Sequence, residues 1–302
     1  MATNKVALGI SLALGAAVSW GAMGIAAQYL LHYCNFEALD LVSIRLVFAG
    51  FLLLAIYRAT GATDLLSPFS SRWAFIQVAI AGLTILGSQL TFMLSIKAAD
   101  AALATILFTT IPLMCASYYC LADRKLPSVS TCLCFVLAST GVTLVVTNGN
   151  FESINFSVAG LLWGLCSSAL CALYSIQPQK VLKKLGVCPV VGWAMVIGGC
   201  TACMFNPPWT LQVHWHLNSI CAFTFIVTIG TVLAFWCYLS SVKYLSAVLV
   251  SLIGCMEPVT AYILSILFYN KSVGLYELVG ILLVLANVMI ISIYSEEKKE
   301  KK

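Results

Sequence analysis

Residues 244–268 read YLSAVLVSLIGCMEPVTAYILSILF, and this stretch decides the fold class. A helix of about 20 apolar residues crosses the hydrocarbon core of a bilayer. The stretch is long enough and apolar enough to do so, yet it carries an acid, Glu257, and a proline, Pro258, near its middle. It therefore predicts a membrane-spanning helix with a charged group and a helix-bending residue at membrane depth.

The rest of the chain has the same character. Of its 302 residues 61% are hydrophobic and only 9% are charged, and the mean hydropathy is +1.00. Because a soluble domain carries about 25% charged residues, lipid must be the main solvent of this chain. The apolar runs are continuous, which excludes a β-barrel. The basic residues form small clusters without interleaved aromatic residues, so we expect no nucleic-acid partner.

Ten apolar runs are long enough to span the membrane, and we place them at residues 6–31, 39–57, 73–95, 99–121, 128–147, 157–178, 190–206, 218–240, 244–268 and 274–294. Ten crossings put both termini on one side. With that side inside, 13 of the 16 Lys and Arg residues fall on inner segments, and only Lys97 and Lys271 fall outside. Arg45 lies within a span. The positive-inside rule therefore predicts that both termini are cytoplasmic.

The two halves of the chain carry matching features in the same order. Lys97 and Pro112 match Lys243 and Pro258 at a common spacing of 146 residues. The other matches are Phe92 with Tyr238, and Trp20-Gly21 with Trp163-Gly164. Because five helices per half is an odd number, the second copy must be inverted. We predict an all-α polytopic membrane protein of ten transmembrane helices in two inverted five-helix repeats, residues 1–150 and 151–302.

Glu257 is the most informative single residue. At a rise of 1.5 Å per residue it lies roughly 16 Å from the outer end of its span. A carboxylate there costs a few kcal/mol unless it is paired, hydrated or protonated. Its repeat counterpart is Ile111, so repeat symmetry does not require an acid. We predict a substrate-binding or gating role, and the alternative is a structural acid bonded to a neighbouring helix end.

Pro112 and Pro258 lie in the middle of their spans, whereas the other six prolines lie at or near loops. Proline removes a backbone donor and bends a helix, so both residues are candidate hinges, with a purely structural kink as the alternative. Arg45 has three interpretations. It extends to the outer interface, it pairs with Glu257, or it closes the outer side.

Further polar and aromatic residues within the spans are candidates for substrate binding or gating. They are Trp20, Gln28, Gln89, Trp163, Tyr174, Trp236 and Tyr262. The alternatives are hydrogen bonding between helices for the glutamines and an interfacial position for the aromatic residues. Among the 13 cysteines, Cys200 and Cys203 form a Cys-x-x-Cys pair inside an apolar span without a nearby His. We therefore expect no metal and no cofactor.

Several of these features together resemble the EamA-type transporters of the drug/metabolite transporter superfamily. They are Trp20-Gly21, Arg45 in the stretch RLVFAG, Pro112, Trp163-Gly164 and the segment Met256-Glu257-Pro258-Val259. The likeness spans roughly residues 6 to 294. The second half departs from the first in lacking a counterpart of Arg45, because its matching region reads Val190-Val191-Gly192-Trp193.

The resemblance implies a central cavity lined mainly by helices 1, 3, 4, 6, 8 and 9, and a small-molecule substrate moved by alternating access. Amino acids or their analogues, often exported, are the implied substrates, and the bacterial inner membrane is the implied location. Helices 5 and 10 form peripheral contacts in some members and dimer contacts in others, so a homodimer is one expected assembly. We expect a transporter rather than an enzyme. A channel, or an enzyme embedded in the membrane, is the alternative.

Overall fold

The computed structural model describes residues 2–34, 36–99, 101–124, 127–153, 157–205, 207, 213, 215–269 and 274–300. Within these residues every regular element of secondary structure is a helix, and no strand occurs. The helices of the first half are α1 (Ala2–Tyr33), α2 (Ala38–Ala59), α3 (Arg72–Ala98), α4 (Ala101–Phe108), α5 (Ile111–Asp123) and α6 (Val129–Thr147). The protein is thus a polytopic all-α membrane protein, as the composition predicts.

The second half begins with α7 (Val158–Ile176), α8 (Gln179–Leu185) and α9 (Val187–Phe205). It continues with α10 (Leu217–Val227), the π-helical segment η4 (Thr228–Leu233), α11 (Ala234–Ser241), α12 (Ala247–Gly254), α13 (Met256–Tyr269) and α14 (Leu275–Glu300). In the described residues, nine helical stretches are long and apolar enough to cross a membrane, and a shorter apolar stretch, Leu275–Ile290, lies within α14. Together these correspond to the ten predicted spans.

Two of the ten spans are broken near a proline. The fourth span consists of α4 and α5, and Pro112 is the second residue of α5. The ninth consists of α12 and α13, and Pro258 is the third residue of α13. Proline fits the first turn of a helix because the amide donors there have no partner within the helix. Both predicted prolines therefore mark real interruptions, while their action as hinges stays a prediction.

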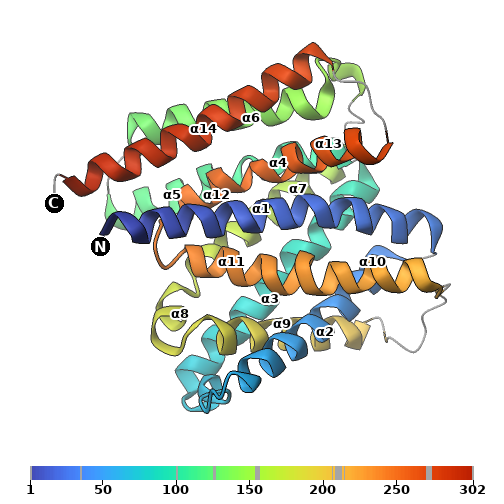
Figure 1. Ribbon diagram of the computed structural model, residues 1–302, viewed down its shortest axis with the longest axis vertical. Coiled ribbons are helices and arrows are strands. Elements are labelled where there is room, and N and C mark those ends of the chain that lie inside the picture. Colours follow the sequence, from blue (N-terminus) through green and yellow to red (C-terminus); the bar gives the residue numbers. More distant parts are fainter. Residues whose placement is uncertain are drawn as a thin grey trace.

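The order of packing follows a simple scheme. α1 packs against α10, η4, α11 and α13, and α7 packs against α3, α4 and α5. Other pairs that join the halves include α2 with α9, α3 with α9, α5 with α12, and α6 with α14. Figure 1 shows α6 and α14 along one edge of the bundle and α2 and α9 along the opposite edge, with α1 between them. If whole spans of equal order in the two halves are exchanged, the pairs α2 with α9, α6 with α14, and the fourth span with the ninth are each returned to themselves.

Glycines permit the closest helix contacts. A Cβ on Gly21 of α1 would lie 2.6 Å from the Glu257 carbonyl oxygen of α13. A Cβ on Gly164 of α7 would meet the Leu107 side chain of α4 and would lie 3.0 Å from the Ser95 Oγ of α3. Small residues let helices approach one another in membranes, where van der Waals packing is a main source of stability. Gly21 and Gly164 therefore both lie where neighbouring helices leave no room for a side chain.

Replacing Gly141 by Ala is expected to lower the free energy of unfolding by about 1–3 kcal/mol. A Cβ there would lie 2.8 Å from the Gly280 carbonyl oxygen, so α6 and α14 would have to move apart. Thermal unfolding of the purified protein in detergent measures the effect. Gly24→Ala is the matched control, because a Cβ at Gly24 meets nothing within 4 Å. Equal stability of the two variants would contradict the close packing of α6 on α14.

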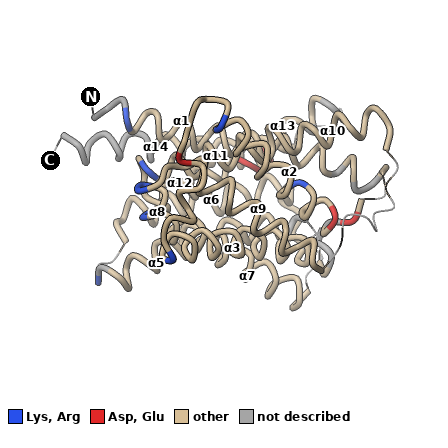
Figure 2. Tube along the Cα trace, turned by 90° about the horizontal axis from the view of Figure 1, so that it is seen from below, with Lys and Arg blue, Asp and Glu red and all other residues tan. Residues whose placement is uncertain are grey.

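Both ends of the chain lie toward the same end of the bundle, because α1 begins and α14 ends there (Figure 1). Figure 2 shows that most Lys and Arg residues gather toward this end, where α5 and α8 also lie. The exposed lysines of α8, Lys180, Lys183 and Lys184, belong to this group, while Val181 and Leu182 of the same helix are buried. The charge asymmetry of the sequence is therefore an asymmetry between the two ends of the bundle.

Candidate functional site

Arg45 joins three helices in the first half of the bundle. It lies on α2, and its side chain is only 2% exposed. Its Nη1 donates to the Met23 sulfur of α1 at 3.1 Å, and its Nη2 donates to the Gln89 Oε1 of α3. Its Nε is buried without an acceptor. The interpretation in which Arg45 extends to the outer interface is therefore wrong, because neutral groups inside the protein bind its guanidinium.

Glu257 lies in the first turn of α13, immediately after the break at Cys255. As a residue, Glu257 is half-buried. Glu257 and Arg45 are near enough to interact electrostatically, but the two described side chains form no direct ion pair. The predicted pairing is therefore a long-range interaction in this conformation, and Gln89 takes the position of the direct partner.

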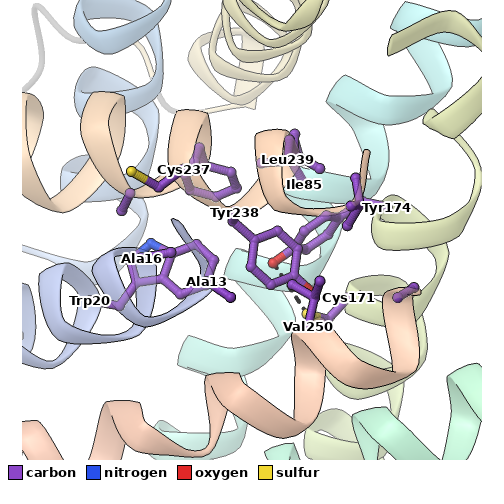
Figure 3. Packing of buried hydrophobic residues seen from close by; sticks show 14 of the residues in the cluster. Ala13, Ala16, Trp20, Ile85, Cys171, Tyr174, Cys237, Tyr238, Leu239 and Val250 are labelled. Carbon is purple, nitrogen blue, oxygen red and sulfur yellow. Dashed lines mark hydrogen bonds between the residues drawn. The ribbon is translucent and has the colours of Figure 1, made fainter. Parts of the chain in front are cut away.

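An aromatic cluster lies beside these charges, and Figure 3 shows Tyr238 between Trp20 and Tyr174. The Trp20 ring centroid is 5.3 Å from that of Phe235 and 5.1 Å from that of Tyr238. The Tyr174 ring lies 6.1 Å from Phe235 and 5.9 Å from Tyr238. Aromatic rings at these separations attract one another beyond simple burial. Four buried rings thereby join helices α1, α7 and α11.

Polar groups line the edge of this cluster. The Tyr238 hydroxyl and the Ser175 hydroxyl are 2.7 Å apart, and the Cys171 thiol donates to the Tyr174 hydroxyl at 3.2 Å. The Trp20 Nε1 is buried without an acceptor. An unsatisfied buried donor costs about 1–3 kcal/mol, so a ligand that accepts from it has an energetic advantage.

The other predicted site residues lie elsewhere. Trp163 of α7 is 41% exposed, which directs it away from the aromatic cluster although it is the repeat counterpart of Trp20. Trp236 of α11 is half-buried and packs against the main core. Tyr262 of α13 is buried and interacts with Glu277 of α14. The side chain of Gln28 lies outside the described residues. The structure thus brings together Trp20, Arg45, Gln89, Tyr174 and Glu257.

Three residues of the site were missed by sequence reasoning: Met23, Phe235 and Tyr238. Tyr238 could have been found, because it matches Phe92 in aromatic character at the repeat spacing. Phe235 lies three residues before it, on the same face of α11. Met23 gave no signal, since a methionine in an apolar span is ordinary. In the part of the chain that the structure describes, no group of three His, Cys, Asp or Glu residues could hold a metal ion.

A bundle of membrane-length helices around a buried arginine, a glutamate and an aromatic cluster defines a polytopic membrane protein with a polar centre. The chain belongs to the EamA-like transporter family, which it matches twice, over residues 7–147 and 158–293. It is accordingly a membrane transporter.

The relatives agree with this assignment. The chain is 32% identical over 286 residues to the uncharacterized inner membrane transporter YicL of Salmonella typhimurium, covering 94% of each chain. It is 24% identical over 249 residues to the uncharacterized transporter YwfM of Bacillus subtilis, covering 79% of this chain and 82% of that one. A crystal structure with 13% identity superposes with a TM-score of 0.81 and covers 96% of this chain and 98% of that one, so the fold is shared.

Proposed function

We propose that the protein is a secondary transporter that exports small organic metabolites, such as amino acids or their analogues, by alternating access. The observation that carries the proposal is the meeting of Arg45, Gln89, Glu257 and the aromatic cluster at the centre of the bundle. Glu257 lies 12 residues before the end of α13, which is about 18 Å of helix. Since the hydrocarbon core is about 30 Å thick, the acid is near the midplane, where transporters bind substrate.

The inverted repeat is part of the proposal. Two family matches of similar length, one per half, support two copies of one unit. The main pairs of spans, second with seventh, fourth with ninth and fifth with tenth, are the same after the halves are exchanged, which supports a two-fold relation between them. Rocking of one half against the other would expose the centre alternately, and the breaks before Pro112 and Pro258 would absorb the bending.

The proposed membrane and the proposed side of the termini rest on sequence similarity and on the distribution of basic residues. The similarity to the inner membrane transporter YicL supports a bacterial inner membrane, and the basic end of the bundle supports cytoplasmic termini. Cysteine labelling tests the orientation. A single cysteine placed near Lys299 should react with a membrane-impermeant maleimide only in broken cells, and reaction in intact cells would reverse the topology.

A two-stage screen tests the function. Thermal shift on the purified protein, with amino acids, nucleosides and polyamines as ligands, identifies solutes that bind. Each solute that binds is then tested for counterflow in proteoliposomes. Saturable counterflow supports a carrier, because a channel would equilibrate the solute without exchange. If no solute that stabilises the protein exchanges across the membrane, the proposal fails.

A further inference from the structure

Arg45 is a buried cation whose described partners are all neutral. Met23 offers a thioether sulfur, which is a weak acceptor, and Gln89 offers an amide oxygen. Glu257 acts on Arg45 from a distance without a direct ion pair. A charged side chain at membrane depth is costly unless an opposite charge or several strong hydrogen bonds compensate it. The environment of Arg45 therefore favours an anion at the guanidinium more strongly than an ordinary buried arginine does.

Two buried donors in this part of the bundle have no acceptor. The Arg45 Nε is buried without an acceptor, and so is the Trp20 Nε1, one turn before Met23 on α1. Arg45 is 2% exposed and Trp20 is 8% exposed, so both donors are shielded from bulk water. An acceptor that reaches them would satisfy two groups that are otherwise unpaired.

The same place is where the two halves differ. Arg45 and Glu257 have no charged counterparts in the other half. The π-helical segment η4 also has none, because the residues 146 positions earlier, 82–87, are ordinary helix within α3. Gly230 of η4 packs on Met23, since a Cβ there would lie 2.6 Å from the Met23 Cβ. Met23, a partner of Arg45, thus lies among features that one half has and the other lacks. One of them is the π-helical segment η4, and π-turns frequently occur at functional sites.

We infer that Arg45 binds a carboxylate of the transported solute, and that Gln89 and Met23 orient its guanidinium for this contact. The inference rests on the proposed transport function and assigns part of its specificity. A guanidinium matches a carboxylate with two parallel hydrogen bonds, which favours this anion over a spherical one. Its Nε has no acceptor and its Nη1 has only the weak contact with the Met23 sulfur, so a carboxylate that takes up either donor displaces little. The apolar body of the solute then lies toward the aromatic cluster of Trp20, Tyr174, Phe235 and Tyr238.

Two matched sets of solutes test the inference on the purified full-length protein. One set is 3-phenylpropionate, phenylalanine and phenethylamine, and the other is 4-methylpentanoate, leucine and 3-methylbutylamine. Within each set the apolar body is kept, and only the third compound lacks the carboxylate. In at least one set we expect the two carboxylates to bind at least about tenfold more tightly than the amine, by titration calorimetry or thermal shift. If in neither set the carboxylates bind more tightly than the amine, or if no carboxylate binds, the inference is wrong.

Substitutions at Arg45 and Gln89 test whether the carboxylate binds at Arg45. Arg45→Gln should remove the preference for carboxylates, and Arg45→Lys should retain part of it because a lysine keeps the charge but loses the fork geometry. Gln89→Leu keeps Arg45 and should weaken carboxylate binding about threefold to tenfold, which serves as the decisive variant if Arg45→Gln fails to fold. Arg72→Gln, at an exposed position, is the matched control and should bind as the unchanged protein does. Unaltered carboxylate affinity in both Arg45→Lys and Gln89→Leu would overturn the assignment.

The same reagents separate this inference from the proposed function. Counterflow of a solute that continues unchanged in Arg45→Gln would overturn the carboxylate contact and leave the transport function standing. Absence of counterflow for every solute that binds, with the Arg45 dependence of binding intact, would overturn the transport function and leave the contact standing.

Discussion

Replacing Glu257 by Gln is expected to abolish the response of transport to a pH gradient and to reduce flux at least tenfold. Gln has the same shape and can form hydrogen bonds, but it neither carries charge nor binds a proton in the accessible pH range. At mid-membrane depth a carboxylate that gains and loses a proton changes the local charge by one unit, which in a medium of low dielectric constant is a large energetic effect. A transporter that uses this proton should lose its coupling when the carboxylate is removed.

Flux into proteoliposomes, with and without an imposed pH gradient, measures this effect. Glu277→Gln is the matched control, because Glu277 is also buried but accepts a hydrogen bond from the Gly274 amide at 2.6 Å, outside the central site. It should lower stability and leave the pH response in place. Should Glu257→Gln retain the full response of the unchanged protein, Glu257 is a structural acid and coupling lies elsewhere or is absent.

The extent of the spans could be predicted from the sequence because it depends on the hydropathy of consecutive residues along the chain. The expected span 128–147 corresponds to α6, Val129–Thr147, and the expected span 157–178 to α7, Val158–Ile176. An irregularity within a span could be predicted from the sequence only where a particular residue type causes it. Proline predicted the interruptions in the fourth and ninth spans, whereas η4 has no comparable signature, because the residues Thr228–Leu233 would be ordinary in a regular helix.

The site could be predicted less completely, for a geometric reason. Depth along a helix follows from counting residues, and that count gave Trp20, Arg45 and Glu257 as candidates for a site within the membrane. Direction around the helix depends on neighbours that the sequence does not identify. Trp163 shows the difference, since it precedes a glycine as Trp20 does, yet it is 41% exposed while Trp20 is 8% exposed. A matching sequence motif therefore does not predict the same side-chain environment.

Deleting Ile229 is expected to preserve the fold and to reduce transport at least tenfold. A π-turn encloses one residue more than an α-turn, so removing one residue from η4 converts it to regular helix and leaves α10 and α11 facing their present neighbours. The Thr231 hydroxyl now donates to the Ile226 carbonyl, five residues earlier, at 2.8 Å. After the deletion the separation is four residues, which is the usual side-chain to backbone bond in helices. The bond therefore survives the change.

What the deletion alters is the contact between Gly230 and Met23, and through Met23 the orientation of Arg45. Transport should fall for this reason while the melting temperature changes little.

Deletion of Leu83 is the control, because Leu83 is the repeat counterpart of Ile229 and lies in regular helix. There the loss of one residue turns the remainder of α3 by about 100° and moves Gln89 away from Arg45. Thermal unfolding and counterflow separate the two variants. If both deletions destabilise the protein equally, η4 is not a one-residue insertion with a role of its own, and the asymmetry around Met23 must arise from Arg45 and Glu257 alone.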